Sequence, residues 1–114
     1  MNEFQIIKKY FSSLAKLSEG SFNLTDDIFF DKEKKIGISI DTYVEGIHFL
    51  DFKKPDLVFK KVLRSSISDL VCKGITPKYY FVSFSANKKS YSKNNILKIR
   101  TALKSEQKKF NIIL

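Results

Sequence analysis

The sequence predicts an α/β domain in which a mixed sheet is flanked by helices. Two hydrophobic periods support this fold class. Apolar residues recur every three or four positions in 3–17, 55–73 and 92–109, as in helices, whereas 36–41 alternates between isoleucine and small or polar residues, as in a strand. With the shorter segments included, the predicted order is α-β-β-β-α-β-α-β.

The first quarter of the chain is predicted to form a helix and then a short strand. Residues 3–17 form the helix, and the polar segment 18–21 ends it. Residues 22–31 are expected to be a loop that enters a strand, and 31–35 form a charged hairpin turn. The face of the helix that we expect to be buried carries Phe4, Ile7, Phe11 and Leu14.

The segment 36–49 is predicted to be a strand, a bend at 42–45 and a second short strand. Its isoleucines at positions 36, 38 and 40 fall on one face, which we expect to pack against a core. Asp41 ends the opposite, small and polar face, and His48, the only histidine, follows the bend. The segment therefore offers an oxygen ligand and a titratable ring.

The second half is predicted to alternate helix and strand. Pro55 suits the first turn of a helix over 55–73, and Gly74 stands where a C-terminal cap is expected. A strand over 78–85 follows, apolar on both faces and so central in a sheet. A polar loop, a helix over about 92–109 and a last strand over 110–114 complete the order. The core stripe of the first of these helices is Phe59, Leu63, Ile67 and Leu70.

Length and composition indicate one domain, residues 1–114. No apolar run approaches the roughly 20 residues that span a membrane. The N-terminus mixes acidic and basic side chains where a signal peptide would be apolar. Because Cys72 is the only cysteine, no internal disulfide can form, and we expect a cytoplasmic location.

The net charge of +9 does not by itself identify a partner. All but two of the 21 basic residues are lysines, and they are scattered through every segment. Nucleic-acid-binding proteins usually gather arginine and aromatic side chains on one face, so no nucleic-acid partner is expected. A basic surface would also attract a polyphosphate ligand.

Three acidic residues stand apart from the dispersed surface charges. Asp27 precedes an apolar run, Asp41 ends the isoleucine segment, and Asp69 lies among apolar residues of a helix. Clustered carboxylates repel one another and need a cation, and Mg²⁺ prefers hard oxygen ligands. The residues alone leave two interpretations open: one metal cluster, or three unrelated acids.

Four ordered motifs resemble thiamine-monophosphate kinase. They are EFQIIKKYF, LTDD, SIDTYVEGIHF and KKVLRSSISDLVCKGITPKYY. The family typically reads GDD, then S-T-D-T-x-V-E-G-x-H-F, then N-L-S-D-L before a glycine and a proline. The VEG-x-HF element is the most specific part, because related ATP-using synthetases share Asp-Asp and S-D-L. The resemblance covers nearly the whole chain and implies the N-terminal domain of the aminoimidazole ribonucleotide synthetase-like fold.

The resemblance also implies ligands and roles for individual residues. Asp27 and Asp41 match magnesium ligands, as do Ser39 and Ile40 through their oxygens. Asp69 matches an aspartate that bridges metal ions around the ATP phosphates. With Asp27 and Asp41 it would bind the nucleotide, whereas His48 matches a contact to thiamine monophosphate. The implied reaction is in-line transfer of the ATP γ-phosphoryl group to thiamine monophosphate, giving thiamine diphosphate, without a catalytic side chain.

The chain departs from the family pattern at several positions. Thr25 replaces the glycine of GDD, Ile40 replaces a threonine, and Ser66 stands at the usual asparagine. The family strand that corresponds to residues 110–114 runs into G-G-D-T, so we expect the chain to end before that motif and before a C-terminal domain. The family fold also implies a homodimer.

Other functions remain open on the sequence alone. The chain could be a fragment of a related ATP-dependent synthetase or a non-catalytic dimerisation or binding module. An isolated histidine is more often structural than a ligand, but its motif favours the ligand role for His48. Ser65 and Ser66 are interpreted as small residues that permit close packing. Lys60 and Lys61 are mainly solvating residues, with phosphate binding as the alternative.

Overall fold

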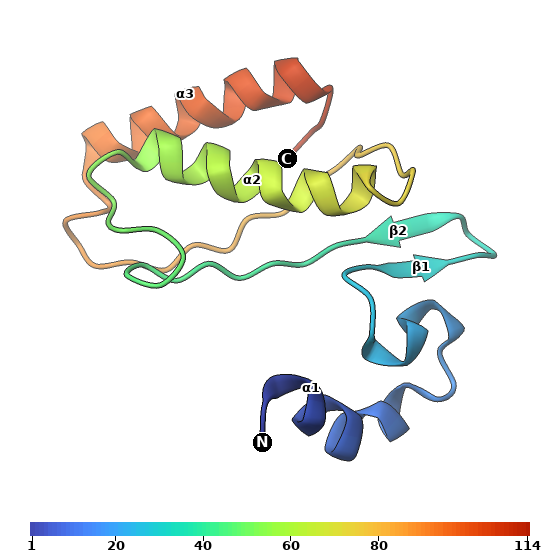
Figure 1. The fold of residues 1–114 in the computed structure, drawn as a ribbon. Coiled ribbons are helices and arrows are strands. Elements are labelled where there is room, and N and C mark those ends of the chain that lie inside the picture. The colour runs from blue at the N-terminus through green and yellow to red at the C-terminus, as the bar shows by residue number, and fades with distance from the viewer. The chain divides into compact units, whose positions relative to one another are not determined.

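The structure is a computed structural model that describes residues 1–114, and it consists of two compact units, Met1–Ile40 and Asp41–Leu114 (Figure 1). The single domain expected from the sequence stays a prediction. Helices and strands are both present, as the predicted α/β class requires. The sheet contains two paired strands in place of the five in the predicted order.

The first unit begins with helical turns of three different kinds. α1 (Glu3–Ile6) is followed by the π-helical turn η1 (Ile7–Phe11) and the 3-10 turn η2 (Ser12–Ala15). π and 3-10 turns hold more and fewer residues than the 3.6 of an α-helix, so apolar side chains spaced for an α-helix do not stay on one face. The predicted buried stripe is therefore wrong, and Phe4 and Leu14 are each 80% exposed.

A second 3-10 segment, η3 (Glu19–Leu24), packs closely against β1 (Phe29–Asp31). A Cβ atom at Gly20 would lie 2.8 Å from the ring of Phe29 and would clash with the carbonyl oxygen of Phe30. Only glycine permits this approach of the two segments.

The predicted hairpin with its charged turn is confirmed. β1 pairs antiparallel with β2 (Ile36–Ile38), and Phe30 lies opposite Gly37. In the turn, the backbone N–H of Lys34 donates to Oδ1 of Asp31 at 3.0 Å. Short polar side chains close turns in this way.

The expectation that the isoleucine face is buried is wrong. Ile36 and Ile38 are 48% and 46% exposed, and Ile40, beyond the end of β2, is 84% exposed. A two-stranded hairpin has no second layer of its own, so one of its faces stays uncovered unless another element packs on it.

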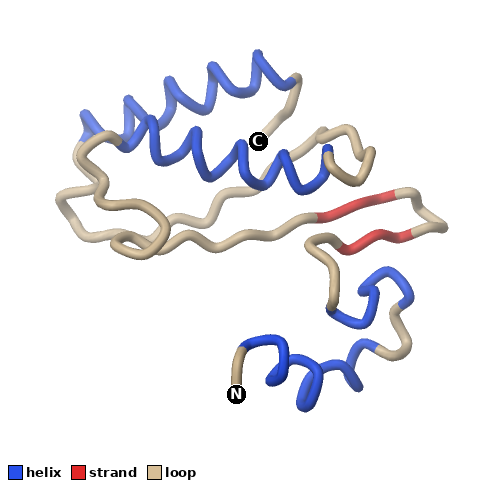
Figure 2. Tube along the Cα trace, in the orientation of Figure 1, coloured by secondary structure: helices blue, strands red, loops and turns tan.

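The second unit is built on two long helices, α2 (Pro55–Val71) and α3 (Lys93–Phe110). They lie side by side and run in the same direction (Figure 1). Figure 2 shows long stretches of irregular chain before α2 and between the two helices. Two parallel helices require such a returning segment between them.

The helix boundaries agree with the sequence to within two residues. Pro55 occupies the first turn of α2, and beyond its end Gly74 has a φ of +73°. The Ser92 hydroxyl caps α3 by accepting the N–H of Asn95. At the other end Asn111 adopts the left-handed conformation that commonly closes helices. These caps determine where both helices begin and end.

The core of the second unit lies between the helices and the end of the chain. It contains the buried side chains of Leu63, Ile67, Tyr80 and Ile112, with Leu103 and Phe110 packed against them. Two members of the stripe predicted for α2 are thus fully buried, and the other two, Phe59 and Leu70, are half-buried.

Three predicted strands of this unit are reduced to isolated bridges: 78–85, 110–114 and the second short strand of 36–49. The segment 78–85 makes one parallel bridge, Tyr79 with Ile113, and the bend before α2 is closed by a bridge between Glu45 and Phe49. Phe81 is 96% exposed, so 78–85 is not the central strand expected. A regular strand forms only when a neighbouring strand pairs with it through backbone hydrogen bonds along several consecutive residues. Each of these segments has a single bridge.

None of the helices combines the length and the apolar character needed to cross a lipid bilayer.

Candidate acidic site on helix α2

A hydroxyl in the C-terminal half of α2 binds a carboxylate from the start of the unit. The Ser66 hydroxyl donates to Oδ2 of Asp41 at 3.0 Å. Asp69 follows Ser66 by three positions, and residues at this spacing are neighbours on a helix surface. The fold therefore brings Asp41 onto the face of α2 that carries Asp69, although 28 positions separate them in the sequence.

Ser66 is the residue of this site that sequence reasoning missed. Its small side chain suggested a packing role, whereas the structure gives its hydroxyl a carboxylate partner. The signal available in the sequence was its position three residues before Asp69, on the same helical face. The spacing of Ser66 and Asp69 indicates a shared site only once Asp41 is known to bind Ser66.

The other predicted ligands lie in the first unit. Asp27 is exposed and sits between η3 and β1, and Ser39 and Ile40 follow the end of β2. Neither unit by itself holds three His, Cys, Asp or Glu side chains placed to share a metal ion. The prediction that Asp27 joins Asp41 and Asp69 therefore stays a prediction.

The backbone that leads to Asp27 has no need of the family's glycine at position 25. Thr25 has a φ of −110°, which any residue can adopt, and its hydroxyl donates to the carbonyl oxygen of Phe22 at 2.6 Å. The left-handed conformations occur earlier, at Phe22, Asn23 and Leu24. The turn before the two acids is thus built differently from one that needs a glycine.

His48 lies in a tight turn of the second unit rather than in a strand. Its backbone N–H and that of Ile47 donate to the carbonyl oxygen of Val44, at 2.9 and 3.1 Å. The N–H of Val44 in turn donates to Nδ1 of the His48 ring at 2.7 Å. The Tyr43 ring meets the imidazole edge to face, with 5.5 Å between the centroids. These contacts fix the orientation of an exposed ring.

One lysine of α2 anchors this turn. Lys61 Nζ donates to the carbonyl oxygen of His48 at 2.8 Å. Lys60 has a different position, because Asp69 follows it by nine residues, about two and a half helical turns. Lys60 therefore projects from the side of α2 opposite Asp69, so a shared phosphate contact with this acid is not supported.

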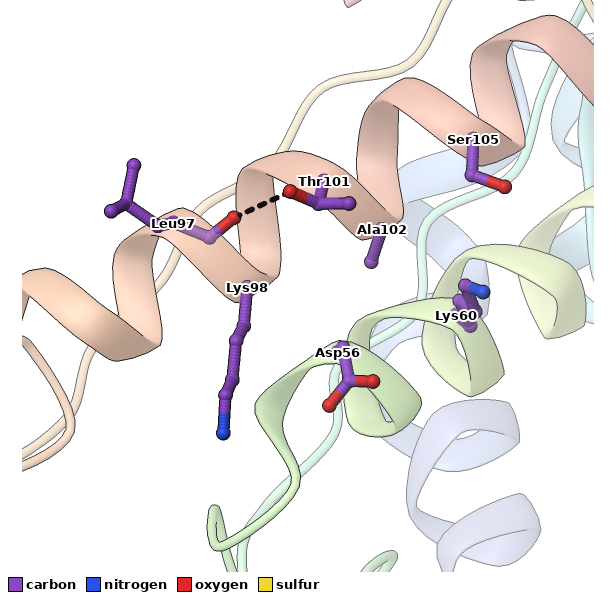
Figure 3. A pocket seen from close by; sticks show the side chains of 7 residues that line it. All are labelled: Asp56, Lys60, Leu97, Lys98, Thr101, Ala102 and Ser105. Atoms are coloured by element: carbon purple, nitrogen blue, oxygen red, sulfur yellow. Dashed lines mark hydrogen bonds between the residues drawn. The ribbon is translucent and has the colours of Figure 1, made fainter.

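A cavity of about 370 Å³ lies on that opposite side, between the N-terminal part of α2 and the middle of α3. Figure 3 shows Asp56 and Lys98 extending from the two helices to the same side. This cavity is separate from the acidic face of α2. It is lined by Asp56, Lys60, Leu97, Lys98, Thr101, Ala102 and Ser105.

An aromatic cluster supports the segment that carries the His48 turn. Phe84 packs edge to face on Phe52 and on Phe59 of α2, with centroid distances of 5.3 and 5.1 Å. Phe49, directly after His48, meets Phe52 at 4.7 Å. The turn is thus tied to α2 by apolar packing as well as by Lys61.

A partly buried ion pair holds the two helices together away from the acidic site. Nε and Nη2 of Arg64 donate to the two carboxylate oxygens of Glu106 at 2.7 and 2.8 Å. The Glu106 side chain is 1% exposed and that of Arg64 45%. The bond to Arg64 lowers the pKa of Glu106 and raises that of the guanidinium.

Burial raises the pKa of Tyr80, whose hydroxyl donates to Gln107 at 2.7 Å.

Comparison with known proteins identifies the family. Residues 25–114 match the family described as AIR synthase related protein, N-terminal domain. The chain belongs to this family. The match includes all the acidic residues discussed above and both long helices.

Curated relatives refine this assignment. The chain is similar to thiamine-monophosphate kinase of Haemophilus influenzae, at 28% identity over 100% of this chain and 35% of that protein. The kinase of Buchnera aphidicola subsp. Schizaphis graminum is 36% identical over 82% of this chain and 32% of its own length. That of Caulobacter vibrioides is 31% identical over 71% and 24%. The resemblance to the N-terminal domain of thiamine-monophosphate kinase is therefore confirmed.

The chain spans about a third of the length of the first two of these relatives. No solved structure gives a significant match.

Proposed function

We propose that this chain is the ATP- and Mg²⁺-binding N-terminal domain of a cytoplasmic thiamine-monophosphate kinase. In the complete reaction, ATP phosphorylates thiamine monophosphate to thiamine diphosphate. The names of the relatives support this substrate and reaction class. The observation that supports the proposal is the hydrogen bond from Ser66 to Asp41, because Ser66 precedes Asp69 on α2 by three positions, the spacing of neighbours on a helix surface.

The donor set of this face fits Mg²⁺. Carboxylate oxygens are the hard ligands that this ion prefers, and it commonly binds one or two of them together with substrate phosphates. Asp41 and Asp69 would hold the ion, and the resemblance implies Asp27 and the oxygens of Ser39 and Ile40 as further ligands. Bound Mg²⁺ would neutralise the charge of two anionic reactants.

The residues of the chain have distinct tasks in this proposal. Ser66 holds the Asp41 carboxylate in one orientation, so that less side-chain freedom is lost when a ligand binds. His48 contacts thiamine monophosphate from a turn that Lys61 and the aromatic cluster attach to the same helix. Asp41, Asp69 and His48 would thus all be carried by α2 and the segment that contacts it.

Calorimetric titration of the 114-residue chain with ATP and Mg²⁺ tests the nucleotide site. We expect heat of binding from the parent and its loss in Asp69→Asn, which removes one negative ligand. Asp56→Asn is the matched control, because it makes the same change on α2 beside the cavity that faces α3. Equal loss in both variants, or no heat in the parent, would instead favour a non-catalytic binding module.

Thiamine monophosphate separates the kinase from a related ATP-dependent synthetase. Both would bind ATP and Mg²⁺ through the same acids, but only the kinase is expected to bind this substrate. A titration in which ATP binds and thiamine monophosphate does not would favour the synthetase.

A further inference from the structure

The two nitrogen atoms of the His48 ring, Nδ1 and Nε2, have different surroundings. Nδ1 accepts the backbone N–H of Val44 at 2.7 Å. A nitrogen that accepts a hydrogen bond carries no proton, so in a neutral imidazole the proton must be on Nε2. The residue is exposed, which leaves Nε2 accessible to a ligand.

The turn makes this arrangement rigid. The carbonyl oxygen of Val44 accepts the N–H groups of Ile47 and His48, so the same residue binds His48 through both its backbone groups. Gly46 permits the reversal with a φ of +79°, and its N–H donates to the carbonyl oxygen of Phe49 at 2.7 Å. Lys61 fixes the carbonyl group of His48 from α2.

We infer that the amide of Val44 locks His48 in the tautomer with the proton on Nε2, and that His48 therefore serves the ligand only as a hydrogen-bond donor. The ligand atom opposite Nε2 must then be an acceptor, such as a phosphate oxygen. The tautomer follows from this turn alone, whereas the identity of the ligand, thiamine monophosphate, rests on the proposed function. His48 in this state is not a base for the substrate through Nδ1, because that atom is occupied.

Nitrogen NMR of the labelled chain tests the lock without any ligand. His48 is the only histidine, so the ring signals belong to one residue. We expect a protonated Nε2, an unprotonated Nδ1, and a scalar coupling across the hydrogen bond between the Val44 amide nitrogen and Nδ1. A proton on Nδ1, signals averaged between two tautomers, or absence of the coupling would overturn the inference.

Two substitutions separate the roles of the two ring nitrogens. In His48→Asn the side-chain oxygen can still accept from Val44, but the shorter amide cannot place a donor at the position of Nε2. In His48→Gln the longer amide can still donate near the position of Nε2, but the acceptor for Val44 is lost. We expect the Asn variant to keep the Val44 amide protected from exchange and the Gln variant to lose that protection.

Titration with thiamine monophosphate completes the test. A lost hydrogen bond to a charged phosphate weakens binding by about tenfold to one-hundredfold, which we expect for His48→Asn. His48→Gln should lose less. Binding by the Asn variant as tight as in the parent would overturn the donor role. A parent that binds no thiamine monophosphate would overturn both the donor role and the proposed function, while the NMR spectrum still decides the tautomer.

Discussion

At the scale of single residues, one hydroxyl group connects the beginning of the second unit to its first long helix. Ser66 donates to Asp41, and both residues keep enough exposure to reach a ligand. In the family pattern that the chain resembles, an asparagine stands at position 66, and its amide can also donate to a carboxylate.

Replacing this serine tests its part in metal binding. In Ser66→Ala the Asp41 carboxylate loses its donor and gains freedom, so we expect the affinity for Mg²⁺·ATP to fall about threefold to tenfold. Ser66→Thr keeps the hydroxyl and should restore most of the affinity. Ser105→Ala on α3, which lines the cavity away from the acidic face, is the control, and calorimetry provides the measurement. An alanine variant with the parent's affinity would contradict this role.

At the scale of elements, the pairing of α2 with α3 depends on a charged contact as well as on apolar packing. Glu106 is buried and receives two hydrogen bonds from Arg64. A buried carboxylate without a partner is strongly unfavourable, so this pair also specifies how the two helices align. Arg64 in addition lies over the ring of Phe110, near the end of α3, at 5.8 Å.

This pair makes the stability of the second unit sensitive to acid. The folded state lowers the pKa of Glu106 below its ordinary value of 4.5. Above that value both states are ionised and the stabilisation is complete. As the pH falls below it, the unfolded chain binds the proton first, so stability declines until the folded pKa is passed.

Thermal unfolding of parent and Glu106→Gln between about pH 6 and about pH 3 isolates this effect. The Gln variant should be less stable at the upper pH, because Arg64 loses its charged partner. The difference between the two curves should shrink toward low pH. Parallel curves over the whole interval would show that Glu106 does not contribute to the acid response.

At the scale of the whole molecule, the last residues of the chain complete the core of the second unit. Ile112 is 2% exposed and packs with Leu63, Ile67 and Tyr80, whereas its neighbour Ile113 is 59% exposed. The final segment is thus a structural part of this unit. Its register with residues 78–80 is set by two backbone hydrogen bonds, Tyr80 N–H to Ile113 and Ile113 N–H to Lys78, each 3.0 Å.

Adjacent isoleucines therefore give a matched pair of substitutions. Ile112→Ala leaves a cavity in the core and should lower the free energy of unfolding by about 2–5 kcal/mol. Ile113→Ala removes an exposed side chain and should change it by less than about 0.5 kcal/mol. Denaturant titration measures both values. Equal effects would mean that the final segment does not pack as described.

Uncovered apolar side chains bear on the proposed homodimer. Ile38 of β2 is 46% exposed and Phe81 is 96% exposed. β2 belongs to a sheet of two strands, and the segment of Phe81 makes a single bridge, so both segments could pair with a further strand. We propose that a second copy of the chain covers them, as the family fold implies. Exposed strand edges and apolar faces of this kind commonly lead to association.

Sedimentation equilibrium tests this association. We expect a dimer in the parent, weakened by at least about tenfold in Ile38→Lys and in Phe81→Lys, because each places a charge in the contact. Leu17→Lys, at a fully exposed position outside these segments, is the control. A parent that remains monomeric at high concentration would contradict the proposal.

The sequence by itself determined the local features. Proline and glycine at the ends of α2 specify backbone conformations within a few residues, so the boundaries of this helix could be read from Pro55 and Gly74. The hairpin between β1 and β2 was also predictable, because the charged residues 31–35 that form its turn are adjacent in the sequence. The motif containing His48 also gave the family, which the comparisons confirm.

Only the tertiary structure decided which distant groups meet. The bond from Ser66 to Asp41, the anchor from Lys61 to His48, and the pair of Arg64 with Glu106 join residues 13 to 42 positions apart. It also decided that Ile38 is exposed, although its alternating pattern predicts burial. Periodicity states which residues share a face, but burial depends on whether another element covers that face, which is a property of the packed chain.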